Sequence, residues 1–489
     1  MPSGDVLNPI STNHYRQLPE ALFSLGNPEP VSAPALQLLN TPLLDEYAQD
    51  HKWFKSNAGL AVLSGNAVNA ANPPIAMAYA GHQFGQRVPL LGDGRAHMLG
   101  QLQTKTGAID VQLKGSGRTQ YSRGGDGRAT LSSVLREHLI SEAMAGLNIP
   151  STRSLGVITT GETVYRETPE PGAVLIRTAR SHIRVGSFQH AANLGDDAVK
   201  ALADHLLKYS YPELTDSAAP YTDLLLSACN RQADLISQWM LCGFIHGVMN
   251  TDNMSLVGET IDFGPCAFMD TFKADKVFSS IDRQGRYAWA KQPGIALWNL
   301  SRFAETLLPL FDNDNDTAIG IAERQLSSFM PAFQTAFYSG LRQKIGLINE
   351  PHTANAFADR TLSVLGQHAI DMTVFFDALT RHVSGESETP LLDLFNNKAD
   401  AIEWLSDWRA LHNNNPGTAD TMRRANPALI ARNHRVEAAL LAATNNNDLK
   451  PLLRLSEALR TPYQCSTENR DLQQPPLPDE VVKETFCGT

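Results

Sequence analysis

The chain has 489 residues, of which 42% are apolar and 19% are charged. This composition is typical of a globular protein and excludes a mainly disordered or fibrous chain, and the length suits an enzyme with two or three lobes around a cleft. The formal net charge of −10 excludes general affinity for nucleic acids or anionic membranes, because both partners would be repelled at long range.

The N-terminal 15 residues show neither a secretory nor a transit signal, and no apolar run approaches the ~18 residues that a membrane helix needs. We therefore expect a cytoplasmic protein, monomeric, with no nucleic-acid or membrane partner. The five cysteines form no CxxC pair, which indicates neither a zinc site nor a secreted disulfide scaffold.

Residues 1–85 carry many prolines between short apolar segments, which predicts an extension wrapped around the core. Residues 86–188 alternate and turn frequently, which predicts a small lobe of mixed helix and strand. In chain order we expect a hairpin over 88–102, a strand over 108–114, a helix over 131–146, and strands near 156–160, 163–167 and 173–179.

Helical patterns dominate residues 189–455, as in the amphipathic stretch over 295–311. A second set of apolar residues falls near one helical face: Leu225, Ala228, Leu235 and Trp239. Residues 456–489 are polar and rich in proline, which predicts a mobile tail. The predicted fold class is therefore α+β, with a small β-rich N-terminal lobe and a larger helical C-terminal lobe.

A short β-like island over 253–264 interrupts the helical region. We predict a hairpin that turns at 258–259 and places Ser255 opposite Asp262. Asn253 and Asp262 then become diagonal neighbours on one face of the hairpin. An amide oxygen and a carboxylate that lie so close are ligands suited to Mg²⁺.

Asp252 comes just before this island, where a loop can direct its carboxylate at a nucleophile. The order HGVMNTDN and then DFG matches a kinase catalytic loop followed by a metal-binding Asp-Phe-Gly. The spacing departs from that pattern, because Asp252 and Asn253 are adjacent where protein kinases separate the two by four residues. The alternative is that these residues only cap turns.

Lys114 ends the predicted strand over 108–114, and Glu137 lies in the helix that follows. A strand lysine held by a helix carboxylate is the device with which kinases contact nucleotide phosphates. The alternative for Lys114 is a lysine that extends along the surface into solvent.

Glycine-rich turns and arginines supply further candidates for a phosphate site. The glycines permit close approach of the backbone, and arginine binds phosphate through two parallel hydrogen bonds. The candidates are Gly92, Gly94, Arg95, Asp126, Gly127, Arg177 and Arg184. Together with Lys114 the cations exceed what a kinase uses on ATP, which suggests a different pose of the nucleotide.

Several longer strings occur in order: YAGHQFGQ, LGDGRA, QLKGSGRTQYSRGGDGRA, REHLISEAMAGLNIPSTRSLG, GFIHGVMNTDNMSL, IDFGP and NPALIARNH. With these strings the chain resembles the selenoprotein O family of protein adenylyltransferases over nearly its whole length. The resemblance implies a bilobal, protein-kinase-like fold that binds ATP in a flipped orientation, so that the α-phosphate faces the acceptor. It also implies transfer of AMP to Ser, Thr or Tyr hydroxyls of proteins.

Carried to this sequence, the resemblance implies that Asp252 is the proton acceptor and that Asn253 and Asp262 are ligands of Mg²⁺. The implied nucleotide contacts are Gly92, Gly94, Arg95, Lys114, Asp126, Gly127, Arg177, Arg184 and Asp262, with Glu137 supporting Lys114. Mn²⁺ is an alternative metal, and UTP an alternative donor. The competing functions are ordinary γ-phosphoryl transfer and a nucleotide-binding pseudokinase scaffold.

Many eukaryotic members of the family carry selenocysteine third from the end, where this chain has Cys487. Because the family is linked to redox control, we hypothesise a reversible disulfide between Cys487 and Cys266, which directly follows DFGP. The alternative is a free thiol on a mobile tail.

Overall fold

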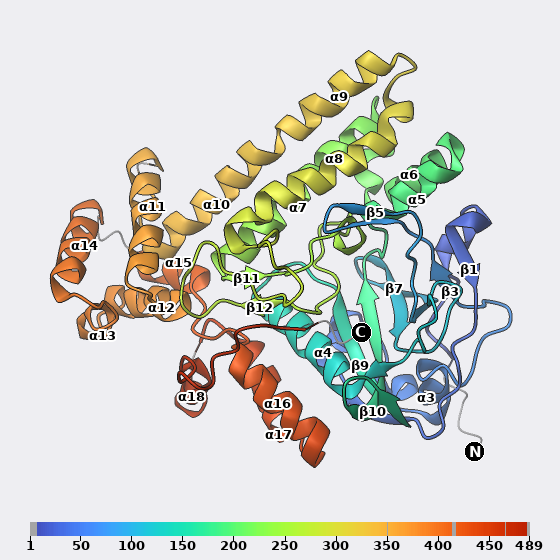
Figure 1. Ribbon diagram of the computed structural model, residues 1–489, viewed down its shortest axis with the longest axis horizontal. Coiled ribbons are helices and arrows are strands. Elements are labelled where there is room, and N and C mark those ends of the chain that lie inside the picture. The colour runs from blue at the N-terminus through green and yellow to red at the C-terminus, as the bar shows by residue number, and fades with distance from the viewer. Residues whose placement is uncertain (1–6, 350, 413–416, 465, 487–489) are drawn as a thin grey trace.

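The computed structural model describes residues 7–349, 351–412, 417–464 and 466–486. The molecule combines one large antiparallel sheet with many helices, so the predicted α+β class is confirmed. Figure 1 shows the sheet at one end of the molecule and the helices α11, α13 and α14 at the other. The strands are β1 Phe23–Leu25, β2 Ala35–Leu39, β3 Ile75–Met77, β4 Gly81–Gln83, β5 Gln86–Val88, β6 Ala96–Thr104, β7 Gly107–Lys114, β8 Ala129–Thr130, β9 Arg153–Tyr165, β10 Pro169–Ala179, β11 Phe244–Ile245 and β12 Ala267–Phe268.

The helices begin with three short ones near the N-terminus and continue through α4 to a long helical region. Their bounds are α1 Thr41–Glu46, α2 His51–Phe54, α3 Asn57–Leu63, α4 Leu131–Gly146, α5 Val185–Leu194, α6 Asp196–Ser210, α7 Pro220–Leu241, α8 Gln292–Phe311, α9 Asn315–Ser327, α10 Phe329–Ile345, α11 Pro351–Gln367, α12 Met372–Val383, α13 Thr389–Leu392, α14 Lys398–Leu411, α15 Thr418–Ala425, α16 Asn433–Asn446, α17 Lys450–Leu459 and α18 Arg470–Gln473. No helix of the described residues is both long and apolar enough to cross a membrane.

The large sheet has the order β1-β3-β6-β7-β10-β9-β2, with β8 paired to β10. Its register positions the site, because Arg177 on β10 lies opposite Gln112 on β7, and Leu175 lies opposite Lys114. Side chains two residues apart on a strand share a face, so Lys114 and Arg177 are diagonal neighbours on one face of the sheet.

Helix α4 packs against strands β9 and β10. Thr130 caps its first turn by accepting a hydrogen bond from the Ser133 amide, and the predicted bounds over 131–146 are confirmed. The helix is buried along nearly its whole length, and Glu137 is one of the buried residues. A carboxylate in that position needs cationic partners, because burial of an unpaired charge is costly.

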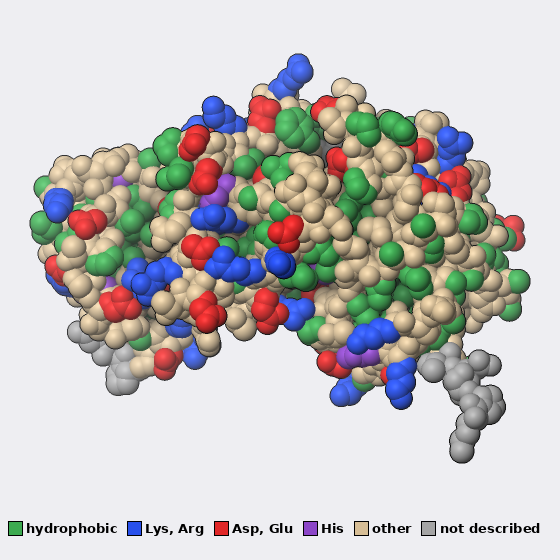
Figure 2. Space-filling view, turned by 90° about the horizontal axis from the view of Figure 1, so that it is seen from below, with side chains coloured by type: hydrophobic (Ala, Val, Ile, Leu, Met, Phe, Trp, Pro, Cys, Tyr) green, Lys and Arg blue, Asp and Glu red, His purple; other side chains and the backbone are tan. Residues whose placement is uncertain are grey.

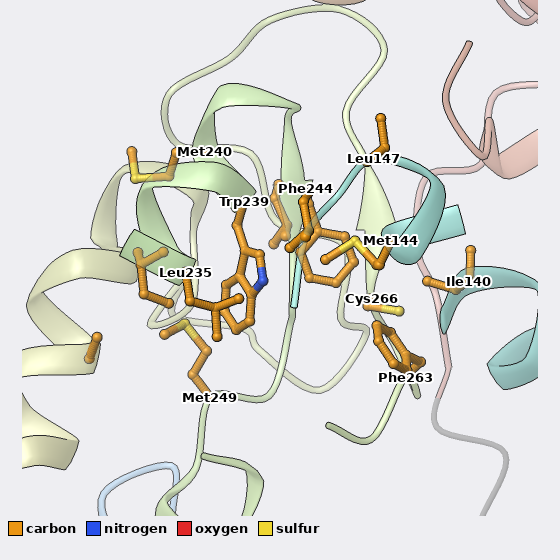
Figure 3. Packing of buried hydrophobic residues seen from close by; sticks show 14 of the residues in the cluster. Ile140, Met144, Leu147, Leu235, Trp239, Met240, Phe244, Met249, Phe263 and Cys266 are labelled. Atoms are coloured by element: carbon orange, nitrogen blue, oxygen red, sulfur yellow. The ribbon is translucent and has the colours of Figure 1, made fainter. Parts of the chain in front are cut away.

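The hydrophobic core continues from α4 into the helical region. Figure 3 shows Phe244 between Trp239 of α7 and Met144 of α4, with Phe263 beside them. The rings of Phe244 and Phe263 lie 6.3 Å apart in an edge-to-face arrangement. The Phe of the Asp-Phe-Gly segment is thus an anchor in the core, and it fixes the neighbouring Asp262 at the cavity described below.

Two predicted hairpins are wrong. Residues 88–102 do not pair with one another, since β5 pairs with β4 and β6 pairs with β7. In the island over 253–264, Ser255 pairs with Arg184 and Thr260 with Ser151. The island is buried, and segments distant in sequence satisfy its peptide groups, which a local pattern cannot reveal.

The first 85 residues contribute β1, β2 and β3 to the large sheet. The strands expected near 156–160 and 163–167 form one continuous strand, β9. The mobile tail stays a prediction, although Leu472 and Thr485 in its described part are buried. The Thr485 amide donates to Phe278 O at 2.8 Å, and its hydroxyl donates to Pro265 O at 2.5 Å. Cys487 lies outside the described residues, so the disulfide with buried Cys266 stays a prediction.

The surface carries both signs of charge. Figure 2 shows Lys and Arg side chains intermixed with Asp and Glu on one face of the described chain, without a broad region of one sign.

Candidate active site

A cavity of about 850 Å³ opens between the sheet, helix α4, the loop that carries Asp252, and the end of the tail. All twelve residues singled out from the sequence line this one cavity: Gly92, Gly94, Arg95, Lys114, Asp126, Gly127, Glu137, Arg177, Arg184, Asp252, Asn253 and Asp262. They come from positions up to 170 residues apart. The fold therefore brings them together, while their chemical roles stay predictions.

Lys114 lies at the centre of a buried ion-pair cluster. Its Nζ is 2.6 Å from Oε2 of Glu137, so the predicted strand–helix pair forms. The same Nζ is 2.7 Å from Oδ1 of Asp262. Lys114 therefore connects the sheet, helix α4 and the Asp-Phe-Gly segment in one place.

Arg177 and Arg184 complete this cluster around Asp262. Arg177 lies 2.6 Å from Oδ1 and Arg184 lies 2.8 Å from Oδ2. Both arginines are nearly inaccessible to solvent, with side chains 2% and 3% exposed. Arg184 also lies 3.7 Å from buried Asp93. Three cations thus face three carboxylates, counting Glu137, so Lys114, Arg177 and Arg184, three of the four cations that the sequence suggested for phosphate, are paired in this cluster.

The charge of Asp262 is fixed by these partners. Burial alone would raise the pKa of this carboxyl, but Lys114, Arg177 and Arg184 hold the pKa well below its ordinary value. The residue also has a φ of +63°, a left-handed conformation that is uncommon for a residue other than glycine. Asp262 is therefore ionised, and the backbone is strained to place it in the cluster.

Asp252 has the opposite environment in the same cavity. Its side chain is buried, and burial raises the pKa to about 6. Its Oδ2 accepts one hydrogen bond, from Gln83 Nε2 at 3.3 Å, whereas its Oδ1 is buried without a hydrogen-bond partner among the described residues. A buried carboxylate with a raised pKa and a vacant acceptor atom has the properties of a general base.

Asn253 lies beside Asp252 with its amide oriented by the backbone. Its Nδ2 donates to Val248 O at 3.0 Å, which leaves Oδ1 as the acceptor atom. In the described part of the chain, no group of three or more His, Cys, Asp or Glu residues could hold a metal. Asp262 retains acceptor capacity, because a carboxylate has about four lone-pair sites and three are used. The pair fits a metal that takes few protein ligands and completes its shell with water and phosphate, as Mg²⁺ does.

The glycine-rich turns serve packing as well as access to the cavity. A Cβ at Gly92 would lie 2.3 Å from the Tyr121 ring, and a Cβ at Gly127 would lie 2.1 Å from the backbone of Gly117. Asp126 is engaged by Arg166 through two hydrogen bonds of 2.8 and 2.9 Å. The hydrogen bonds from Arg166 lower the pKa of Asp126 to about 2.

Several residues of the cavity and of the ion-pair cluster beside it were not found from the sequence. Arg136 of α4 donates to the carbonyls of Gly264 and Cys266, at 3.2 and 2.8 Å, and so holds the segment after Asp262. Gln112 joins the cluster through Arg177 Nε at 3.2 Å. Such positions carry no local signal, although REHLISEAMAG already contained Arg136 one residue before Glu137. Further lining residues come from the tail: Val482, Glu484, Thr485 and Phe486.

Residues 6–460 of the chain match the family described as Protein adenylyltransferase SelO. The chain belongs to the SelO family.

Related proteins are similar to this chain over almost their whole length. A protein nucleotidyltransferase YdiU of Shewanella denitrificans is 50% identical over 496 residues, which cover 99% of this chain and 98% of that protein. Proteins of the same name are 48% identical in Bradyrhizobium sp., over 98% of both chains, and 48% identical in Halalkalibacterium halodurans, over 97% of this chain and 96% of that protein. The resemblance to selenoprotein O and the prediction of a nucleotidyltransferase are confirmed for this SelO-family chain.

Proposed function

We propose that this SelO-family chain transfers AMP from ATP to Ser, Thr or Tyr hydroxyls of proteins. The observation that carries the proposal is the pair of aspartates in one cavity, with Asp262 ionised among three cations and Asp252 buried with a vacant oxygen. The carboxylate of Asp262 can carry a permanent negative charge, and the carboxylate of Asp252 can accept a proton. The names of the relatives, protein nucleotidyltransferases, support nucleotidyl transfer to a protein acceptor.

In the proposed step, the acceptor hydroxyl oxygen attacks the α-phosphorus of ATP. The bond from this phosphorus to the bridging oxygen breaks, pyrophosphate leaves, and the hydroxyl proton passes to the carboxylate of Asp252. Because the pKa of Asp252 is about 6, the carboxylate is mostly ionised at neutral pH and still basic enough to accept a proton. Little covalent chemistry falls to the protein, so positioning and charge neutralisation supply most of the rate.

Asn253 and Asp262 would hold the metal, with Mg²⁺ as our choice and Mn²⁺ as the alternative. When bound, the metal neutralises phosphate charge and orients the phosphates. The charge of the cavity lining supports a role for the metal. The eight Lys and Arg side chains of the lining are nearly balanced by seven Asp and Glu side chains. A triphosphate brings more negative charge than this small surplus can neutralise.

We also propose the kinase-like arrangement with ATP in the flipped orientation. Arg177 and Arg184 are the most buried cations of the lining, which supports placing the β- and γ-phosphates at the deep end of the cavity. The α-phosphorus would then lie nearer to the opening, where a protein hydroxyl can reach it. Lys114, held by Glu137, would contact the phosphates from the sheet.

Radiolabelled ATP tests the proposal. The wild-type protein is incubated with acceptor proteins and ATP labelled on either the α- or the γ-phosphate. We expect the α-label to become protein-bound and the γ-label to be released as pyrophosphate. Transfer of the γ-label alone would contradict AMP transfer and indicate a kinase, and transfer of neither label would indicate a scaffold. Labelled UTP in a parallel reaction separates UMP from AMP transfer, and chelation by EDTA should abolish either reaction.

A further inference from the structure

The strands β4 and β5 form a two-stranded sheet of their own, separate from the large sheet. They contain half of the string YAGHQFGQ, to which neither the fold nor the proposed step assigns a task. In the register of this hairpin, Gln83 lies opposite Gln86 at the turn, and Phe84 in that turn has a φ of +51°. Gln83 and Phe84 also line the cavity.

Consecutive residues of the hairpin contact consecutive residues of the Asp252 loop. The His82 amide donates to Thr251 Oγ1 at 2.7 Å, and the Phe84 amide donates to Asn250 Oδ1 at 3.0 Å. Between these two backbone contacts, the Gln83 side chain reaches Asp252. The hairpin is therefore held against residues 250–252 of the loop by three contacts, which do not follow one another in the same order along the two segments.

Other residues hold the two flanking contacts in place. Thr251 Oγ1 donates to Gln189 Oε1 at 2.7 Å, and Asn250 Oδ1 also accepts from the Tyr287 hydroxyl at 2.6 Å. These bonds would keep the loop and the hairpin together without Gln83. Among the described residues, the Gln83 amide is the side-chain group that hydrogen-bonds the carboxylate of Asp252.

The two oxygens of Asp252 are distinguished by this hairpin. Gln83 Nε2 donates to Oδ2 at 3.3 Å. Oδ1 instead faces Gly81, where a Cβ would lie only 2.3 Å away. Any larger residue at 81 would therefore displace the carboxylate, whereas glycine leaves Oδ1 unpartnered within a buried space.

We propose that Gln83 is a positioning residue that, by donating to Oδ2, holds the carboxylate of Asp252 in the orientation in which it accepts the proton of the acceptor hydroxyl. The proposal rests on the proposed function in taking Asp252 as the proton acceptor. A carboxylate without this hydrogen bond would rotate about its terminal torsion, which is broad, and would spend less time in the productive geometry.

Gln83→Met tests the proposal, because methionine is similar in length and cannot donate a hydrogen bond. The matched control is Gln86→Met, which makes the same change on the exposed partner of the same hairpin. We expect Gln83→Met to lower kcat by about 10- to 100-fold while KM for ATP stays unchanged. Gln86→Met should leave both constants unchanged, and Gln83→Lys, which restores a donor, should recover part of kcat.

A double-mutant cycle separates positioning from a structural role. In an Asp252→Asn background, Gln83→Met should cause no further loss, because the group that it positions no longer accepts a proton. The proposal is overturned if the same loss persists in that background, if Gln86→Met has an equal effect, or if only KM for ATP rises.

The Gln83 variants are compared with the wild type by transfer of whichever phosphate label, α or γ, the wild type transfers. Transfer of the γ-label would therefore refute AMP transfer without deciding the role of Gln83. A second measurement needs no turnover at all. In protein labelled with ¹⁵N at glutamine, the side-chain amide resonance of Gln83 should shift on Asp252→Asn and that of Gln86 should not. An unchanged Gln83 resonance would show that the contact does not form.

Discussion

Asp252 and Asp262 are ten residues apart and line the same cavity, yet the groups that contact their carboxylates differ, and so do the directions in which their pKa values shift. Asp262 has three cations within 2.8 Å of its oxygens, and its pKa is held well below the ordinary value. Asp252 has one neutral amide, and burial raises its pKa to about 6. Asp252 is buried and the side chain of Asp262 is only 20% exposed, so it is mainly the set of partners that decides which of them holds charge and which can exchange a proton.

The two carboxylates also have opposite effects on the stability of the fold. Asp262 stabilises the fold by neutralising cations that the sheet and the start of α5 bring together. Asp252 costs stability when it is ionised, because its charge is buried with little compensation. The contrast predicts that amide substitutions at the two positions will have opposite effects on stability while both abolish or reduce activity.

The largest expected effect comes from Asp262→Asn. The change leaves Lys114, Arg177 and Arg184 without their shared counter-charge, and it removes a proposed metal ligand. We expect protein-bound α-label to fall by about 1,000-fold, and the nucleotide-free protein to lose about 3 kcal/mol of stability. Transfer assays and denaturant unfolding measure the two effects.

Asp204→Asn, which removes an exposed ion pair with Lys200, is the control and should change neither transfer nor stability by much. Retained transfer in the Asp262 variant would mean that the assigned metal and phosphate site is wrong.

Asp252→Asn should give the next largest loss of activity. Removal of a general base is expected to lower kcat by about 100-fold or more. Nucleotide affinity should not change, because the phosphate cations do not depend on this carboxylate. Titration with a fluorescent ATP analogue measures the affinity. A parallel fall in affinity would place Asp252 in nucleotide binding and remove the distinction between the two aspartates.

The same variant should be more stable than the wild type at high pH. The folded-state pKa of Asp252, about 6, lies above the ordinary value of 3.8, so deprotonation opposes folding. The cost is absent below about pH 4, grows as the pH rises toward 6, and reaches about 2–3 kcal/mol above that. Thermal unfolding of the metal-free, nucleotide-free proteins at pH 4 and pH 8 measures it. An equal difference between the two proteins at both pH values would contradict the assignment of the raised pKa.

The smallest effect is expected at the rim of the cavity. Arg166→Gln removes the partner of Asp126, and the pKa of Asp126 should rise from about 2 toward its ordinary value. Because the side chains of both residues are partly exposed, KM for ATP should rise by less than about fivefold. Arg454→Gln, which breaks the exposed pair with Asp471 far along the chain, provides the matched control. A loss as large as that of Asp262→Asn would show that the rim matters as much as the buried cluster.

Some secondary-structure elements, several residues of the cavity and the family were predictable from the sequence. Helix α4 follows from its apolar pattern and the Thr130 cap, and the order of strand and helix predicted the pair of Lys114 and Glu137. The Asp-Phe-Gly segment and the glycine-rich turns drew attention to residues that do line one cavity. The family assignment rests on long strings of sequence, and the match over residues 6–460 agrees with it.

The errors share a cause. The island around Ser255 was expected to pair with itself, but Arg184 and Ser151, far away in sequence, provide its partners. The tail was expected to be mobile, and no local pattern shows that the Thr485 hydroxyl hydrogen-bonds Pro265 O. Segments this short show too brief a pattern to identify their partners, so their pairing depends on the surface that the rest of the fold presents.

By itself, the sequence determined which residue types are present for phosphate and metal chemistry. The positions of glycines, arginines and carboxylates along the chain can be read locally, without knowledge of the fold. Only the tertiary structure decided their charge. Asp252 and Asp262 are the same residue type, and their protonation depends on cations from β7, β10 and the start of α5, and on an amide from β4. Electrostatic interactions act through space between segments distant along the chain, so the fold alone makes one aspartate a permanent charge and the other a candidate base.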